Sequence, residues 1–253
     1  MDTFLEFALV GFFAQLVDGS LGMGFGVISS AVLLAQGVPP PLVSASVNAA
    51  KLPTGATAVA SNYYHKNIDW TLVIVLSIFG SLGGILGASA LSGLKGPALQ
   101  YLVNSYLILI GSYIIYRGLS GIMPRVANKG RFRLIGFMGG LIEGIGGSWG
   151  PIVNTGLLGS GVPSRYAIGS TNVSEFVVSF VVFVSLSLSY YFGFWGHGTD
   201  WNQVATTVLG LAAGGLPAAF FGGYLAKMAP RRPLTIAVGL FAVSVAIYRF
   251  STM

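Results

Sequence analysis

The chain contains no cysteine and few charged residues. Among its 253 residues, 13 are Lys or Arg and 7 are Asp or Glu, so charged side chains make up 8% of the sequence, whereas an ordinary soluble domain has about a quarter. The absence of cysteine excludes disulfides, thiolate metal ligands and a thiol nucleophile. So few charges cannot cover the water-facing surface of a folded chain of this length, and 54% of the residues are hydrophobic. The composition therefore excludes a soluble enzyme, a nucleic-acid-binding protein and a disordered chain, and it predicts a protein embedded in lipid.

The N-terminus also lacks the features of a secretory signal peptide. The segment from Met1 to Glu6 carries two acids, Asp2 and Glu6, and no basic residue, whereas a signal peptide begins with a positively charged region. We therefore expect the first hydrophobic segment to remain in the mature protein.

Apolar stretches of about 20 residues are typical of membrane-spanning helices. They cover, roughly, residues 41–62, 70–92, 97–117, 166–192, 201–227 and 232–250. Two further apolar regions, residues 3–36 and 134–160, are interrupted by the glycine-rich segments Asp18–Gly26 and Glu143–Pro151. Each flanking piece of about 11–15 residues would be roughly 16–22 Å long as a helix, which is short for a crossing. Each region therefore predicts a re-entrant hairpin, whose break must be surrounded by protein or by a water-filled cavity.

The second half of the sequence repeats the first in the same order. The matched segments are Gly11-Phe12 with Gly136-Phe137, Asp18-Gly19 with Glu143-Gly144, Gly37-Val38-Pro39 with Gly161-Val162-Pro163, Asn48 with Asn172, Lys51 with Glu175, and Tyr116-Arg117 with Tyr248-Arg249. The order predicts two membrane repeats, residues 1–120 and 134–253, which are joined by a basic linker at residues 121–133 and together form one domain.

The distribution of basic residues predicts the orientation of the repeats. If each interrupted region returns to its own side, each half crosses the membrane three times, and the side with the basic linker holds ten Lys and Arg against two, with Lys51 left aside as intramembrane. If each region crosses once, the split is seven against five. The positive-inside rule favours the first arrangement, with the linker in the cytoplasm and both termini outside. The predicted fold class is an all-α polytopic membrane protein with two inverted repeats, each a broken re-entrant helical hairpin plus three transmembrane helices. This architecture is typical of secondary transporters.

Glycines gather at both breaks and suggest a substrate site there. The candidate substrate-binding residues are these glycines and the serine beside them, namely Gly22, Gly24, Gly26, Gly146, Gly147 and Ser148. A helix N-terminus preceded by glycines exposes free N–H groups and a partial positive charge, which suits a small anion. The alternative is close helix packing, because both breaks hold glycines four residues apart. Such packing is also expected of the spaced pairs Gly83 and Gly87, and Gly210 and Gly214.

Polar residues follow each break at matched positions of the next predicted helix. They are Ser46, Asn48 and Lys51 in the first half, and Ser170, Thr171, Asn172 and Glu175 in the second. Ionisable residues within a membrane are costly and usually functional. The two asparagines offer amide donors to an oxyanion, and Lys51 is the clear intramembrane cation. A structural ion pair of Lys51 with Glu175 or with Asp18 is the alternative, and the two roles are compatible.

Asp18 and Glu143 lie at the edges of the two breaks. A carboxylate there either carries a proton or cation during transport or caps the turn by accepting backbone N–H bonds. With an anionic substrate, these acids contact it only when they are protonated. The two histidines, His65 and His197, fall in predicted loops, so we expect no metal site and no cofactor.

The paired motifs resemble the TauE/SafE sulfite exporter family. Both halves begin with Gly-Phe, an acid and a glycine cluster, and continue with Gly-Val-Pro and a Ser-x-Asn helix, most clearly over Gly11–Pro39 and Gly136–Asn172. The resemblance covers essentially the whole chain. It implies a membrane transporter of small sulfur-containing anions such as sulfite, sulfonates or thiosulfate-like compounds, with contacts at the glycines and at Asn48 and Asn172. The glycine runs are thinner here than is usual in that family, and the bulky residues between them are expected to narrow the site.

The leading hypothesis is a secondary transporter of the cell membrane that moves a small anion, such as a sulfur oxyanion or organosulfonate, by alternating access. An enzyme is not expected, because no base lies beside a nucleophile in the predicted helices. The alternatives are a channel-like conduit and a cation- or proton-coupled transporter that uses Asp18 and Glu143. The expected partners are the anion, the bilayer and a coupling proton or ion, without nucleic acid. The sequence leaves the identity of the anion, the direction of transport and the oligomeric state open.

Overall fold

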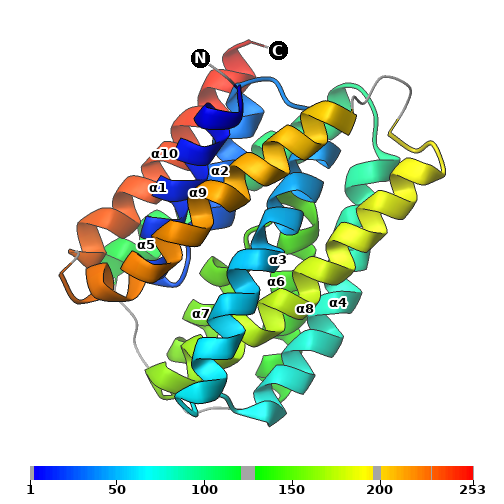
Figure 1. The fold of residues 1–253 in the computed structure, drawn as a ribbon. Helices are drawn as coiled ribbons and strands as arrows, with labels where there is room; N and C mark the ends of the chain where they lie inside the picture. Colours follow the sequence, from blue (N-terminus) through cyan, green and yellow to red (C-terminus); the bar gives the residue numbers. More distant parts are fainter. Residues whose placement is uncertain (1–2, 121–128, 196–200, 229, 253) are drawn as a thin grey trace.

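The computed structural model describes residues 3–120, 129–195, 201–228 and 230–252. All regular secondary structure in these ranges is helical, as Figure 1 shows, which confirms the predicted all-α class. The first half of the chain contains α1 (Thr3–Leu21), α2 (Phe25–Ala35), α3 (Pro40–Tyr64), α4 (Trp70–Gly93) and α5 (Pro97–Ser120). The second half contains α6 (Lys129–Gly146), α7 (Trp149–Gly159), α8 (Ser164–Tyr191), α9 (Trp201–Met228) and α10 (Arg231–Ser251).

Within the described ranges, five helices are long and apolar enough to cross a membrane, namely α1, α4, α5, α8 and residues 232–251 of α10. Helices α3 and α9 were also predicted to cross but are not among them. In α3, polar residues such as Asn48 and Lys51 lower the hydropathy, and in α9 the described apolar part is the shorter segment Val204–Ala219. Every residue from Pro41 to Lys51 is buried. The first half of α3 is therefore enclosed by protein, whereas most residues after Lys51 are partly or fully exposed.

Each hairpin turns at a glycine with left-handed backbone. Gly22 and Gly147 have φ angles of 68° and 69°, a conformation that suits the residue after a helix end. Their N–H groups donate to the carbonyls of Asp18, at 2.6 Å, and Glu143, at 2.8 Å. The helices thus continue through both acids as far as the glycine. The first arms, α1 and α6, therefore have 19 and 18 residues, more than predicted, whereas α2 and α7 have 11 each.

The Gly-Val-Pro sequence after each hairpin forms the same turn in both halves. Gly37 and Gly161 have φ angles of 80° and 81°. In each turn the valine N–H donates to the carbonyl five residues earlier at 3.1 Å, which is the hydrogen bond of a Schellman helix end. The matched sequence motif therefore marks a matched structural element.

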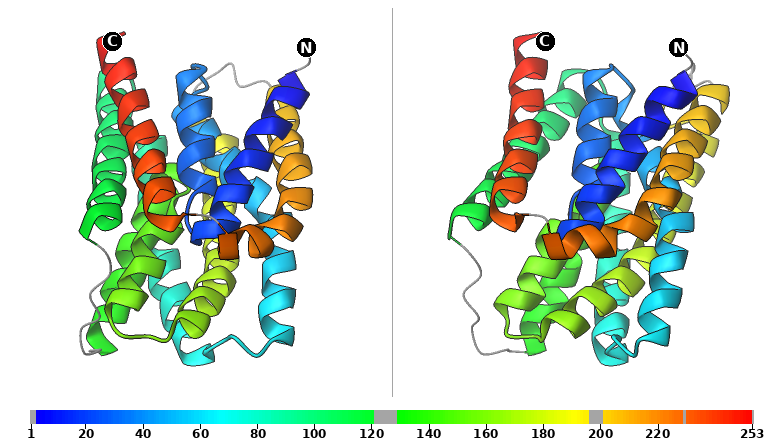
Figure 2. Two further views of the ribbon diagram at one scale, coloured as in Figure 1. Left: turned by 90° about the vertical axis from the view of Figure 1, so that its left-hand side faces the viewer. Right: turned by 60° about the vertical axis from the view of Figure 1, so that its left-hand side comes forward.

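The two halves of the chain are interlocked. Helix α1 packs along α9, α6 packs along α4, and the pairs α3 with α8 and α5 with α10 join the halves again (Figure 2). Two repeats related by a two-fold axis would make such contacts, because each helix of one half then packs on a helix of the other half. The start of α1 and the end of α10 lie at the same end of the molecule. The inverted relation, the domain boundaries and the membrane side of each end stay predictions, and residues 121–128 of the basic linker lie outside the described ranges.

Glycines allow helices from the two halves of the chain to touch backbone to backbone. A Cβ atom at Gly140 in α6 would lie 1.9 Å from the carbonyl oxygen of Gly80 in α4, and one at Gly214 in α9 would lie 1.8 Å from that of Ala8 in α1. Small residues serve the same purpose in other membrane helices, where close packing replaces the hydrophobic effect. The contacts predicted from glycine spacing are confirmed at Gly83, Gly87, Gly210 and Gly214.

We expect Gly140→Leu to lower the melting temperature in detergent by about 5–10 °C, because overpacking forces α4 and α6 apart. The matched control is Gly93→Leu, since a Cβ atom at Gly93 meets nothing within 4 Å. Thermal unfolding of the two purified variants measures the difference. Equal melting temperatures would contradict the tight α4–α6 contact.

Candidate functional site

A cavity of about 540 Å³ lies beside the first hairpin break. Its wall is formed by the end of α1, by α3 and by the first half of α8, with contributions from α7 and α9. The charged and amide side chains of the wall are Gln15, Asp18, Lys51, Asn62, Asn154, Asn172 and Glu175. The lining continues along α3 to Ser61, which is exposed. The cavity therefore runs from the buried centre of the protein toward the end of α3.

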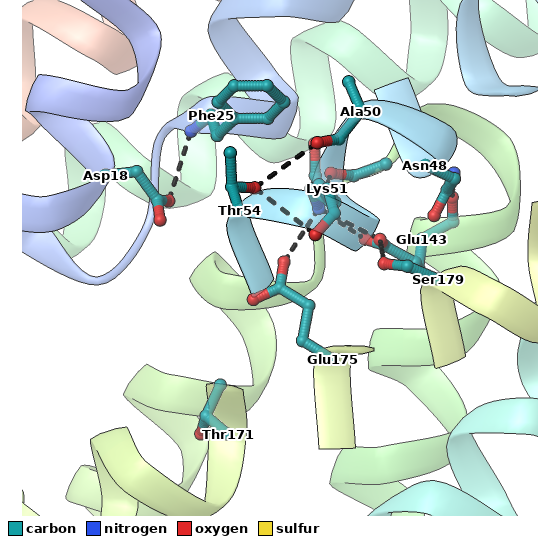
Figure 3. A network of polar contacts seen from close by, with 12 residues as sticks. Asp18, Phe25, Asn48, Ala50, Lys51, Thr54, Glu143, Thr171, Glu175 and Ser179 are labelled. Atoms are coloured by element: carbon teal, nitrogen blue, oxygen red, sulfur yellow. Dashed lines mark hydrogen bonds and ion pairs between the residues drawn. The ribbon is translucent and has the colours of Figure 1, made fainter. Parts of the chain in front are cut away.

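Lys51 is the cation of this cavity, and it joins three parts of the chain (Figure 3). Its Nζ atom lies 2.9 Å from Glu143 Oε1 and 2.7 Å from Glu175 Oε1, and it donates to the Gly147 carbonyl at 2.6 Å. An ammonium group has three donors, so these acceptors satisfy it. The structure therefore contains the Lys51–Glu175 ion pair that the sequence suggested as an alternative, and it adds Glu143.

The two glutamates that bind Lys51 differ in their surroundings. The Glu143 side chain is fully buried, and its Oε1 also accepts a hydrogen bond from Ser179 Oγ at 2.8 Å. The Glu175 side chain is 21% exposed and lines the cavity. Glu143 is thus the fixed counter-ion of Lys51, whereas Glu175 can be reached by a ligand in the cavity.

Side chains from three helices cap the C-terminal end of α6. The last carbonyls of a helix have no partner within it, and here donors from α2, α3 and α5 reach the carbonyls from Glu143 to Gly147. The donors are Ser30, Ser44, Asn48, Lys51 and Tyr106. The positive charge of Lys51 also lies at the negative end of the helix dipole. The second break is consequently filled by protein donors, and the cavity opens only beside the first.

Asp18 occupies the corresponding place in the first half. Its Oδ1 accepts the N–H of Phe25, the first residue of α2, at 3.2 Å. A carboxylate at a helix N-terminus stabilises the free N–H groups and the helix dipole. The side chain also lines the cavity. The geometry thus contains the capping contact, and the proton-carrying role stays a prediction.

The two glycine-rich breaks touch each other. A Cβ atom at Gly26 would lie 1.5 Å from the carbonyl oxygen of Gly147, and one at Gly150 would lie 2.7 Å from that of Gly22. Close packing, the alternative role of these glycines, is therefore present. Gly22 lines the cavity. The predicted residues that pack against protein and do not line it are Gly24, Gly26, Gly146 and Gly147.

The matched asparagines occupy different places. Asn172 lines the cavity. Asn48 is fully buried, and its Nδ2 donates to the Ser44 carbonyl at 2.8 Å and to the Glu143 carbonyl at 3.5 Å. Asn172 is therefore available to a ligand, whereas Asn48 holds the end of α6.

Four other predicted residues lie in the protein interior away from the cavity. The hydroxyls of Ser46 and Thr171 are buried without a hydrogen-bond partner in the described chain, and Figure 3 shows Thr171 apart from the Lys51 cluster. Ser170 Oγ accepts from the backbone N–H of Asp69 at 3.0 Å, so it ties α8 to the loop before α4. Ser148 Oγ shares a hydrogen bond with a tyrosine hydroxyl of α5.

Sequence reasoning missed three amide side chains of the cavity, those of Gln15, Asn62 and Asn154. Asn154 is buried, its Nδ2 donates to the Gly22 carbonyl at 3.4 Å, and its Oδ1 has no partner in the described chain. Gln15 lines the wall one turn before the first break. An asparagine within the short apolar segment after the second break was the available signal for Asn154. No pattern in the sequence singles out Gln15.

Negative charge exceeds positive charge at this site. One ammonium, that of Lys51, stands among the carboxylates of Asp18, Glu143 and Glu175. Charges interact strongly where little water screens them, so an anion entering the cavity meets a net repulsion unless protons or cations accompany it. Among the described residues, no three His, Asp or Glu side chains gather in a way that could hold a metal ion.

Sequence comparison assigns the chain to a family. The model of the family described as "Sulfite exporter TauE/SafE" matches residues 7–249. The chain belongs to the TauE/SafE family. Within curated proteins, this TauE/SafE chain is 32% identical over 253 residues to a Bacillus subtilis (strain 168) protein named "Probable membrane transporter protein YtnM", and the match covers 97% of the chain and 82% of the relative. No solved structure matches. The protein is thus an integral membrane protein of a transporter family.

We expect Lys51→Met to lower the melting temperature by about 10 °C, because it leaves the buried Glu143 carboxylate unpaired. The double variant Lys51→Met/Glu143→Gln should recover much of the loss, since it removes both charges. Glu175→Gln serves as the control and should change the melting temperature little, because its side chain reaches the cavity. A double variant as unstable as Lys51→Met would contradict the assignment of Glu143 as the fixed counter-ion.

Proposed function

We propose that the protein is a secondary transporter of a small anion, a sulfur oxyanion or an organosulfonate, and that the anion binds in the cavity beside Lys51. The observation that carries this proposal is the position of that cavity: residues from both halves line it, and it reaches the one buried ammonium of the described chain. Its volume of about 540 Å³ lies within the usual range for small-molecule sites. Family membership supports the substrate class.

The anion would replace Glu175 as a partner of Lys51. Glu143 and the Gly147 carbonyl keep the ammonium in place, so one of its three donors can turn to a ligand when Glu175 moves away. Amide donors of Asn172 and Asn154 lie in the same wall. An oxyanion accepts several hydrogen bonds at once, and bonds to a charged group are the stronger kind.

Alternating access would follow from movement of one half against the other. Helices α3 and α8 form the contact between the halves along the cavity, and the described cavity leads toward the end of α3. In the second conformation of the transport cycle, the site would open on the other side of the Lys51 cluster. Inverted repeats with broken helices operate in this way in many secondary transporters. A channel-like conduit, the alternative, would pass anions without counterflow.

Protons would enter with the anion, because the site carries excess negative charge. The titratable groups that face Glu175 are Lys51, Glu143 and Asp18. Glu143 is held by Lys51 and Ser179, whereas Asp18 and Glu175 line the cavity and are the carboxylates that a proton or cation entering it can reach. Neutralising them removes the repulsion on the anion and releases Lys51. The same two carboxylates favour cation transport as the second candidate function.

We expect Asn172→Ala to raise the KM for sulfite about tenfold, because the lost hydrogen bond is to a charged ligand, while the melting temperature stays unchanged. Uptake of radiolabelled sulfite into proteoliposomes measures this effect. The matched variant Asn48→Ala should instead lower the melting temperature, because it uncaps α6. If sulfite, thiosulfate and methanesulfonate all fail to enter with folded wild-type protein, the anion proposal is wrong.

We expect methanesulfonate uptake to acidify the interior of proteoliposomes that contain the pH dye pyranine. Methanesulfonate does not titrate near neutral pH, so any acidification reports protons carried by the protein. Glu175→Gln should keep exchange of internal for external anion but lose the acidification, and Glu6→Gln on the exposed start of α1 is the control. Uptake without acidification in the wild type would contradict proton coupling, and a sodium requirement would favour a coupled cation.

A further inference from the structure

A second cavity, of about 470 Å³, lies on the other side of α7 from the Lys51 site. The last turns of α5, the first turns of α6 and the end of α7 form its wall. Its polar side chains are Tyr113, Tyr116, Arg117, Ser120, Arg131, Thr155 and Ser160. The described wall contains two arginines and no carboxylate, so its charge is positive, in contrast to that of the central cavity.

Arg117 is the unusual member of this wall. Its Nε and Nη2 atoms are buried and have no hydrogen-bond partner in the described structure. A buried N–H group without an acceptor is unfavourable, and more so when it belongs to a charged group. A ligand in the cavity that accepts hydrogen bonds from the guanidinium would satisfy these N–H groups.

The matched arginine of the other half shows which acceptors are missing. In the sequence, Tyr116-Arg117 corresponds to Tyr248-Arg249. Arg249 Nε donates to Asn104 Oδ1 at 2.9 Å, and its Nη1 donates to the Leu34 carbonyl at the end of α2. Arg117 lies at the corresponding end of α7, near Gly159, but none of the described residues accepts from it in the place of Asn104. The unsatisfied donors thus belong to one half only, where the cavity lies.

We propose that this cavity binds a tetrahedral phosphate-type oxyanion between Arg117 and Arg131. The guanidinium fork matches such an oxyanion through two parallel hydrogen bonds, and the hydroxyl of Ser120 is a further polar group in the wall. The ion is either the head group of an anionic phospholipid or free inorganic phosphate. Basic pockets between membrane helices bind acidic head groups.

The surroundings favour the phospholipid. Tyr116 and Leu134 of the cavity wall are 61% and 62% exposed, and the neighbouring Leu119 is 67% exposed. These side chains form an apolar surface next to the cationic cavity, along which acyl chains can lie while the phosphate enters. The cavity is separate from the transport site, so the proposal does not depend on the substrate.

Thermal unfolding of the full-length protein in nanodiscs tests the proposal. Adding phosphatidylglycerol to phosphatidylcholine nanodiscs should raise the melting temperature of the wild type by about 5 °C. Arg117→Gln and Arg131→Gln should each lose most of this increase. The matched control Arg133→Gln should keep it, because Arg133 lies on the same helix, packs over Phe79 and does not line the cavity.

A parallel series with inorganic phosphate in neutral nanodiscs distinguishes the two sources. Stabilisation by phosphatidylglycerol alone identifies a lipid head group, and stabilisation by phosphate alone identifies a free ion; either result supports the site if Arg131→Gln abolishes it. Arg131 is exposed, so this variant should fold even if Arg117→Gln does not. No stabilisation by either compound, or equal stabilisation of wild type and Arg131→Gln, would overturn the proposal.

Discussion

The arrangement of both hairpin breaks depends on the buried ammonium of Lys51. This group binds a carboxylate of α6, a carboxylate of α8 and the carbonyl of Gly147 at the second break. A buried charge without partners is strongly destabilising, so α3, α6 and α8 must keep these positions relative to one another. Because Gly26 of the first break packs directly on Gly147, the same contact also fixes where the first break lies. The cavity lies beside the first break, and Lys51 and Glu175 are part of its wall.

Much of the fold could be predicted from the sequence. Hydropathy located the long helices, since apolar stretches of about 20 residues have few alternatives in a membrane, and glycine density located both breaks. The lengths of α1 and α6 were underestimated, because an acid and a glycine next to each other suggested an earlier break at Asp18 and Glu143. Both helices in fact end where a left-handed residue is required, at Gly22 and Gly147.

The site was less predictable because residues at matched positions of the sequence repeat have different surroundings in the structure. Asn48 and Asn172 match in sequence, yet Asn48 is bonded to α6 and Asn172 lines the cavity. The difference arises from residues such as Ser30 and Tyr106, which cap α6 from other helices. Such contacts between distant segments leave no trace in local spacing. Charge near the breaks was informative, but which carboxylate is fixed depends on burial, which separates Glu143 from Glu175.

The pairing of Lys51 with Glu175 also bears on how the two halves of the chain differ. These residues occupy matched positions in the two halves and carry opposite charges that neutralise each other. A protein assembled from two copies of the second half would gather only carboxylates at its centre, and one assembled from two copies of the first would bring two ammonium groups to the same point. Each half has therefore become the complement of the other. Replacing either residue by its match from the other half would therefore remove the ion pair that joins α3 to α8.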